Sequence, residues 1–218
     1  MRTLLRGDTI GIVSPASAPS DGLYDDARNF LHRHGFESKL FGVPAPSFGR
    51  MSARDDVRAK AIHDAFLDPS VAAIICARGG YGSGRLTEAL DYSLIASHAK
   101  PFVGYSDITN LLMSMHLRTG ITTFHGPMLG DLTTTTDEWS IERLFSMLSS
   151  EKLECQISND NYSVLSPGKG QGRLIGGNIS ILCSMAGYTQ FAANDDVVVA
   201  LEDVGEFLYC LDRSLVQL

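Results

Sequence analysis

Apolar residues recur along the first 125 positions in two patterns, short continuous runs and runs with helical spacing, and the two patterns alternate. The continuous runs predict strands over 9–14, 36–41, 71–77, 102–105 and 121–124. The helical spacing predicts helices over 21–34, 53–67, 84–90 and 108–117. Alternating strands and helices are typical of a parallel sheet covered on both faces. We therefore expect an α/β domain of the flavodoxin or Rossmann-like type, with ligands bound at the carboxyl ends of its strands.

The pattern changes after a further expected helix over 141–148. Residues 149–169 are polar and rich in turn-forming residues, which indicates a boundary between domains. We expect an N-terminal domain over 1–150, a linker over 151–170 and a smaller C-terminal domain over 171–218. The last part has an apolar helix over 179–186, a strand over 197–201 and an amphipathic start over 207–218. Fewer than fifty residues make a poor independent domain, so we expect the C-terminal domain to be truncated and incomplete.

The composition argues against several classes of function. The formal net charge is −7 and basic residues form no cluster, so a nucleic-acid partner is not expected. The N-terminus lacks the apolar stretch of a signal peptide, and no run approaches the ~18 to 20 apolar residues that cross a bilayer. The cysteines, at 76, 155, 183 and 210, lack C-x-x-C spacing, so we expect free thiols in the reducing cytoplasm. No ligand spacing suggests a metal, and no cofactor is expected.

The segment from Phe102 to Asn110 carries the first candidate for chemistry. A short apolar strand runs into a helix with Ser106 at the junction, a geometry that exposes a nucleophilic hydroxyl near free backbone N–H groups. Gly104 supplies the small residue before the serine, but Ile108 stands where the G-x-S-x-G pattern has its second glycine. The alternative is that Ser106 or Asp107 merely caps the helix.

A glycine-rich loop follows the expected strand over 71–77. Its glycines allow the backbone to approach a ligand closely, and Arg78 and Arg85 flank it with cations that suit a carboxylate or an oxyanion. The loop matches neither G-x-G-x-x-G nor a phosphate-binding loop, so dinucleotide binding is a weak alternative. A tight structural turn is the other alternative.

Acidic residues end the last strand: Glu202, Asp203 and Glu206 follow the apolar run over 197–201. A lone acid at such a place is usually solvated. A serine nucleophile, however, needs a base, and the base needs a carboxylate that orients it.

Six segments occur together and in one order, and together they resemble the LD-carboxypeptidases (murein tetrapeptide carboxypeptidases). The segments are Gly7-Asp-Thr-Ile-Gly-Ile-Val-Ser-Pro-Ala, Arg78-Gly-Gly-Tyr-Gly, Gly104-Tyr-Ser-Asp-Ile-Thr, Gly126-Pro-Met, Gly176-Gly-Asn and Leu201-Glu-Asp. They span nearly the whole chain. The resemblance implies a Ser-His-Glu peptidase that releases the terminal D-alanine of a murein tetrapeptide, at an L,D-peptide bond, during peptidoglycan recycling.

Roles for individual residues follow from the resemblance. It implies that Ser106 is the nucleophile, that Glu202 is the triad carboxylate, and that the amides of Gly79, Gly80 and Asp107 form the oxyanion hole. It also implies substrate contacts at Arg78, Tyr81 and His125, and a homodimer.

In the family, the triad histidine lies well beyond Leu-Glu-Asp, and this sequence ends before such a position is reached. The histidines present are 32, 34, 63, 98, 116 and 125. We expect His125 to form a wall of the pocket, with a role as substitute base a minor alternative. This chain alone is therefore predicted to be inactive.

Two other functions stay open. The related immunity peptidases that disarm peptide-nucleotide antibiotics share Gly-Tyr-Ser-Asp and the triad, although the Arg78 to Gly82 loop favours the murein enzymes. The second alternative is a catalytically inactive module that binds peptide.

Overall fold

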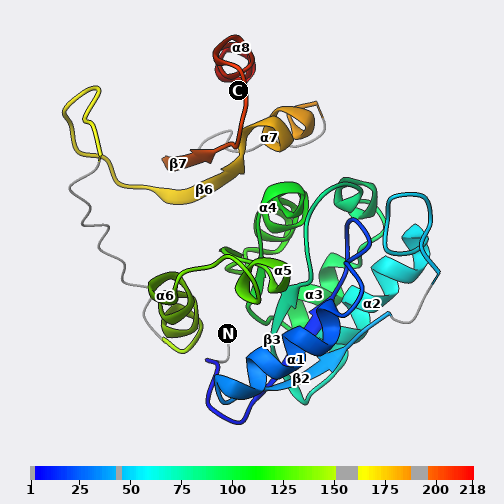
Figure 1. The fold of residues 1–218 in the computed structure, drawn as a ribbon. Coiled ribbons are helices and arrows are strands. Elements are labelled where there is room, and N and C mark those ends of the chain that lie inside the picture. The colour runs from blue at the N-terminus through cyan, green and yellow to red at the C-terminus, as the bar shows by residue number, and fades with distance from the viewer. Residues whose placement is uncertain (1–2, 43–45, 151–161, 188–195) are drawn as a thin grey trace.

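Five parallel strands form the main sheet of the protein, in the order β2-β1-β3-β4-β5 (Figure 1). The computed structural model describes residues 3–42, 46–150, 162–187 and 196–218. The strands are β1 (Thr9–Val13), β2 (Glu37–Leu40), β3 (Val71–Cys76), β4 (Phe102–Gly104) and β5 (Phe124–His125). This order is that of flavodoxin-like folds, in which the chain changes direction between β1 and β3 and leaves a crevice at their carboxyl ends. The expected α/β class with a parallel sheet is confirmed.

Helices cover both faces of this sheet. They are α1 (Leu23–Arg33), α2 (Asp55–Leu67), α3 (Tyr92–Ser97), α4 (Thr109–Thr119), α5 (Leu129–Leu132) and α6 (Glu138–Leu148), with short 3-10 helices η1 (Ser83–Leu86) and η2 (Ser106–Ile108). Buried side chains of α2, α3 and α4 pack in one cluster, where the rings of Phe66 and Phe102 stack at 6.0 Å. Those of α1, α5 and α6 pack in a second cluster on the other face. Every residue of β3 is buried between the two.

The C-terminal part builds a separate two-stranded parallel sheet. It comprises β6 (Arg173–Asn178), α7 (Ile179–Met185), β7 (Val197–Glu202) and α8 (Leu208–Gln217). It lies beside α4 (Figure 1), where Met113 packs with Ile175, Leu182 and Met185. Much of β7 is exposed, and α8 has no buried residue. Most of the expected linker, 151–161, lies outside the described residues, so the domain boundaries stay a prediction.

Some elements differ from those that the sequence predicts. The expected helix over 84–90 is only the 3-10 helix η1, and the expected strand over 121–124 is the short β5. The strand β6 is not among the predicted elements, because Gly176 and Gly177 are unfavourable in strands. Cys76, Cys183 and Cys210 are free thiols, and Cys155 lies outside the described residues. No described helix has both the length and the apolar character needed to cross a membrane.

Candidate active site

Ser106 lies at the expected turn between a strand and a helix. β4 ends at Gly104, and Ser106 opens η2, which leads directly into α4. Its φ is 58°, the one positive value for a described residue other than glycine. A positive φ strains the backbone of a serine, and such strain persists only where the surrounding structure holds the backbone in place. A Cβ on Gly104 would lie 2.6 Å from Cγ2 of Ile108, so the turn requires a glycine before the serine and tolerates isoleucine after it.

Asp107 is buried, and its carboxylate braces the same turn. Its Oδ2 accepts a hydrogen bond from the Ser83 N–H at 2.9 Å, and its backbone carbonyl accepts from Nδ2 of Asn110 at 3.1 Å. Neither Ser106 nor Asp107 caps a helix through its side chain. The capping alternative is therefore wrong, because Asp107 bonds across to the glycine-rich loop.

The glycine-rich loop approaches Ser106 with its backbone. A Cβ on Gly79 would lie 3.5 Å from Oγ of Ser106, so the backbone of this glycine lies directly beside the hydroxyl. Within the described part of the chain, neither the Gly79 nor the Gly80 N–H donates to a backbone carbonyl. The Tyr81 N–H donates instead to Oγ of Ser17, at 3.1 Å. Gly79 and Gly80 line the same cavity as Ser106, so their amides are candidates for stabilising a developing negative charge.

A cavity of about 460 Å³ opens beside Ser106. Its lining is Ser20, Leu23, Arg78, Gly79, Gly80, Tyr105, Ser106, Met128, Gly130, Asp131 and Thr134. Arg78 and Asp131 give it one positive and one negative charge. The exposed Tyr81 is not part of this lining, although it follows Gly80.

Arg85 does not serve the cavity, contrary to the expectation from the sequence. Its guanidinium makes a two-pronged ion pair with Asp55, with Nε and Nη2 at 2.9 and 2.7 Å from Oδ2 and Nε also at 3.2 Å from Oδ1. Of the two arginines expected to flank the loop, only Arg78 lines the cavity. Its Nη1 donates to the carbonyl of Ala18 at 3.3 Å.

Glu202 and His125 meet where the two sheets approach each other. His125 ends β5 beside Gly104 of β4, and its Nε2 lies 3.8 Å from Oε1 of Glu202, the last residue of β7. The rings of Tyr105 and His125 are 6.0 Å apart and nearly perpendicular. Oε1 of Glu202 is buried and accepts no hydrogen bond from any described residue. Tyr105, which directly precedes Ser106, therefore forms one cluster with His125 and Glu202.

Asp203 and Glu206 have other surroundings. The carboxylate of Asp203 accepts from Oγ of Ser180 at 2.7 Å, from Nδ2 of Asn178 at 3.3 Å and from the Val204 N–H at 2.8 Å. Burial alone would raise the pKa of Asp203, but these hydrogen bonds outweigh it and lower the pKa. Glu206 is exposed. Of the three acids, only Glu202 lies against His125.

Two pKa shifts describe the polarity of the cluster. Burial lowers the pKa of His125, and the Glu202 carboxylate opposes that shift only in part. Burial also raises the pKa of Tyr105, and the carboxylates of Asp131 and Glu202 add to the effect. At neutral pH the imidazole is thus neutral and able to accept a proton, and the phenol stays protonated.

The Gly176-Gly-Asn segment holds Glu202 at this place. A Cβ on Gly177, which has a φ of +135°, would lie 2.6 Å from Cγ2 of Thr109, at the start of α4. The Asn178 N–H donates to Oγ1 of the same threonine at 3.1 Å. Because Asn178 pairs with Glu202 across β6 and β7, this contact ties the acid to the helix that follows Ser106.

Sequence reasoning missed three residues near the site: Tyr105, Asp131 and Arg58. Tyr105 and Asp131 line the cavity, and Arg58 is buried beneath the glycine-rich loop. Their signals are weak, because an acid after Gly-Pro-Met or an arginine in an expected helix is ordinarily solvated. Over the described ranges, no three histidine, cysteine or acidic side chains gather as metal ligands.

The chain matches two family models in sequence. Residues 10–126 match the LD-carboxypeptidase N-terminal domain, and residues 171–218 match the C-terminal domain of the same family. A probable murein peptide carboxypeptidase of Bacillus subtilis is 36% identical over 100% of this chain and 69% of its own length.

Solved structures of similar proteins share the fold of this chain. An MccF-like protein of Bacillus anthracis superposes with a TM-score of 0.88 at 30% identity, covering 99% of this chain and 74% of that one. A muramoyltetrapeptide carboxypeptidase of Oxalobacter formigenes superposes with a TM-score of 0.82 at 29% identity, covering 96% and 70%. The chain belongs to the LD-carboxypeptidase family.

Proposed function

We propose that this protein is a serine carboxypeptidase that releases the terminal D-alanine from murein tetrapeptides at an L,D-peptide bond. The observation that carries the proposal is the strained turn at Ser106, with a φ of 58°, beside a cavity of about 460 Å³. Family membership and relatives named as murein peptide carboxypeptidases support the same conclusion. Peptidoglycan recycling in the cytoplasm and a homodimeric state are part of the proposal.

The proposed mechanism gives each residue one role. Oγ of Ser106 attacks the carbonyl carbon between the diamino acid and D-alanine, and the C–N bond breaks after a tetrahedral intermediate. The amides of Gly79, Gly80 and Asp107 stabilise the negative oxygen of that intermediate. Glu202 orients the imidazole that takes the serine proton and passes it to the leaving amine. Water then hydrolyses the acyl-enzyme.

The proposed base is a histidine that this sequence does not contain. His125 is the one described histidine in contact with Glu202, and we place it at the edge of the substrate site, next to the cavity-lining Tyr105. A serine hydroxyl without a base is a weak nucleophile at neutral pH. The 218-residue chain alone is therefore expected to hydrolyse a tetrapeptide negligibly.

Charges in the cavity support a peptide with both an amine and a carboxylate. Arg78 and Asp131 line it together with Ser106, and the carboxylate of Asp131 also accepts from the Met128 N–H at 3.2 Å. We assign Arg78 to a substrate carboxylate and place Tyr81 and His125 at the edge of the same site.

A second candidate is cleavage of a peptide-nucleotide, as in an immunity protein. The likeness to an MccF-like structure at a TM-score of 0.88 favours it. The Arg78-Gly-Gly-Tyr-Gly loop favours the murein substrate instead.

The test is D-alanine release from a murein tetrapeptide. The 218-residue chain is compared with a chain continued through a complete family C-terminal domain, each as wild type and as Ser106→Ala. We expect release from the continued wild type alone, with a loss of roughly 10⁴ to 10⁶-fold on Ser106→Ala. Ser106-dependent release by the 218-residue chain would instead indicate that His125 acts as the general base. Cleavage of an aminoacyl nucleotide in preference to the tetrapeptide would favour the second candidate.

A further inference from the structure

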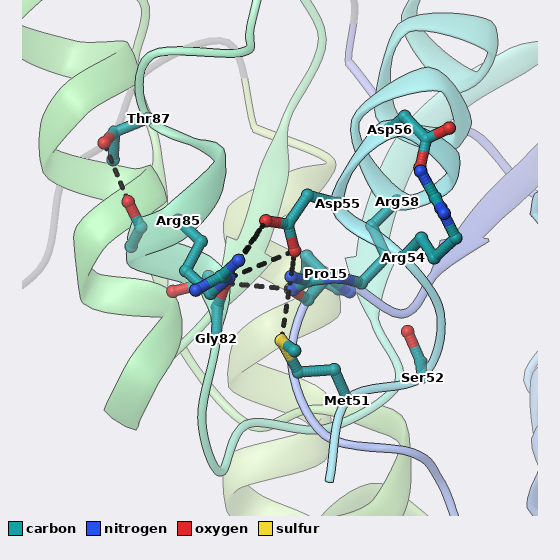
Figure 2. Close-up of polar contacts among 12 residues, drawn as sticks. Pro15, Met51, Ser52, Arg54, Asp55, Asp56, Arg58, Gly82, Arg85 and Thr87 are labelled. Atoms are coloured by element: carbon teal, nitrogen blue, oxygen red, sulfur yellow. Dashed lines mark hydrogen bonds and ion pairs between the residues drawn. The ribbon is translucent and has the colours of Figure 1, made fainter. Parts of the chain in front are cut away.

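Arg58 of α2 is a buried arginine that none of the proposed catalytic steps uses. It is only 2% exposed, although charged side chains are rarely fully buried without partners. Its guanidinium donates to the carbonyls of Pro15 and Gly82, to Oδ1 of Asp55 and to the sulfur of Met51 (Figure 2). One cation thus links the loop after β1, the segment before α2 and the loop after β3.

The peptide between Gly82 and Ser83 is held at both of its ends. Its carbonyl accepts from Nη1 of Arg58 at 2.9 Å, and its N–H donates to Oδ2 of Asp107, also at 2.9 Å. Asp107 directly follows Ser106 in the chain. A short path of hydrogen bonds therefore runs from the guanidinium to the turn in which Ser106 has its positive φ.

Arg58 also reaches the glycine-rich loop from its other side. It donates to Pro15 in the loop after β1, and two residues later the Ser17 N–H donates to the carbonyl of Gly79 at 3.3 Å. Oγ of Ser17 accepts from the Tyr81 N–H at 3.1 Å. The carbonyls of Gly79 and Gly82 are thus both occupied by donors away from the nucleophile, while the Gly79 and Gly80 amides donate to no described backbone carbonyl.

Asp55 fixes the guanidinium itself. Its Oδ1 lies 2.6 Å from Nη2 of Arg58, while Arg85 binds the same carboxylate from the loop side (Figure 2). The Arg85 guanidinium, together with that of Arg58, holds the pKa of Asp55 below its ordinary value, so the carboxylate is charged at neutral pH. Bonds between charged partners are stronger than neutral ones.

We propose that Arg58 is a positioning residue, which holds the Ser106 turn and the Gly79 and Gly80 amides in the geometry that acyl transfer requires. It acts through the Gly82–Ser83 peptide and Asp107 and does not touch the substrate. That this geometry serves acyl transfer rests on the function proposed above. The hydrogen-bond path from Arg58 to the Ser106 turn can be tested without measuring any activity.

The first measurement is amide hydrogen exchange by NMR on the 218-residue chain. Arg58→Met keeps the length of the side chain and removes its donors. Arg54→Met is the matched control, since Arg54 lies just before α2 and its side chain pairs, among the described residues, only with the exposed Asp56. We expect exchange at Ser83 to rise about 10-fold or more in Arg58→Met relative to Ile12 in β1, and to stay unchanged in Arg54→Met. Equal acceleration at Ile12 and Ser83 would mean a loss of global stability only, and would overturn the proposal.

Two milder variants keep the test decisive where Arg58→Met does not fold. Arg58→Lys keeps the charge but cannot serve all of its acceptors, and Asp55→Asn weakens the anchor. Each is expected to accelerate exchange at Ser83 roughly 3- to 10-fold over Ile12. Unchanged protection at Ser83 in both variants would overturn the proposal.

The second measurement separates positioning from simple binding, in a chain continued through a complete family C-terminal domain. A peptidyl boronic acid, with boron in place of the scissile carbonyl, requires the serine and the oxyanion amides, whereas the tripeptide product requires only the pocket. We expect Arg58→Lys to weaken the boronate at least about 10-fold and the tripeptide less than about twofold. Equal effects on the two ligands would overturn the positioning role. Wild type that binds neither ligand would count against the proposed function, while the exchange result would still decide the structural link.

Discussion

The five-stranded sheet and the two-stranded sheet hold their functional residues in different ways. In the first, β3 is buried along its whole length and two large apolar clusters pack on its faces. In the second, β7 is largely exposed and α8 buries no residue. Ser106 therefore lies between a strand and a helix that pack into the core of the main sheet, whereas the position of Glu202 depends on the docking of the two-stranded sheet against α4.

The contact between the two sheets shows how little apolar packing that docking uses. Met113 of α4 packs with a small cluster that includes Ile175 and Leu182, and the backbone at Gly177 rests on Thr109. A backbone contact at Gly177, rather than a large apolar core, places Glu202 next to His125 and ties it to the helix that follows Ser106. We therefore expect mutations in the main sheet to change the stability of the fold, and mutations at the docking contact to change the placement of Glu202.

The largest expected effect is on the stability of the main sheet. Phe102→Ala removes a fully buried ring and should lower the free energy of unfolding by about 3 to 5 kcal/mol. Leu174→Ala in β6, where the side chain is 65% exposed, should change it by less than about 1 kcal/mol. Urea unfolding of the 218-residue chain compares the two variants. Similar losses in both would contradict a division into a self-sufficient sheet and a docked one.

A smaller effect is expected from Gly177→Ala at the docking contact. The new methyl group would meet Thr109 at a φ that disfavours alanine, a strain of about 1 to 3 kcal/mol. Hydrogen exchange should accelerate about 5- to 100-fold in β6 and remain unchanged in β3. Gly168→Ala is the control, because a Cβ there meets nothing within 4 Å. Acceleration in β3 as well would show that the two sheets unfold together.

The smallest predicted effect concerns pH at the meeting point of the two sheets. Burial lowers the pKa of His125 in the folded protein, so the unfolded chain binds its proton at higher pH. The contribution to stability is complete above about pH 6.5 and is lost as pH falls toward the lowered folded value. Thermal melts from about pH 7.5 to 5 should show a smaller decrease in Tm for His125→Asn than for wild type. An equal or larger decrease in the variant would refute this assignment.

The sequence was sufficient where a local pattern determined the structure. Apolar runs predicted the parallel sheet, and the run into Ser106 predicted its turn, because strand and helix signals meet at one residue. The same patterns failed to predict structure that depends on contacts between segments distant in the sequence. β6 forms because Gly176 and Gly177 allow a close approach to Ala200 and Thr109, a reason that local propensity cannot show.

The site was predictable to a similar extent. The motifs drew attention to Ser106 and Glu202, but not to the pairing of Arg85 with Asp55, which turns an expected ligand contact into a structural one. Nor could the pattern of α2 reveal that Arg58 points inward, because the carbonyls that compensate its burial come from two other loops.

We propose that the active site assembles from both sheets, with Glu202 rather than its neighbour Asp203 as the orienting acid. The most direct test is kcat/KM for D-alanine release by Glu202→Gln and Asp203→Asn, in a chain continued through a complete family C-terminal domain. We predict a loss of about 10⁴-fold for Glu202→Gln, because an amide no longer holds the imidazole in the tautomer that can accept the serine proton. For Asp203→Asn we predict a loss below about 10-fold. A Glu202→Gln variant within about twofold of wild type, or a larger loss for Asp203→Asn, would contradict the account.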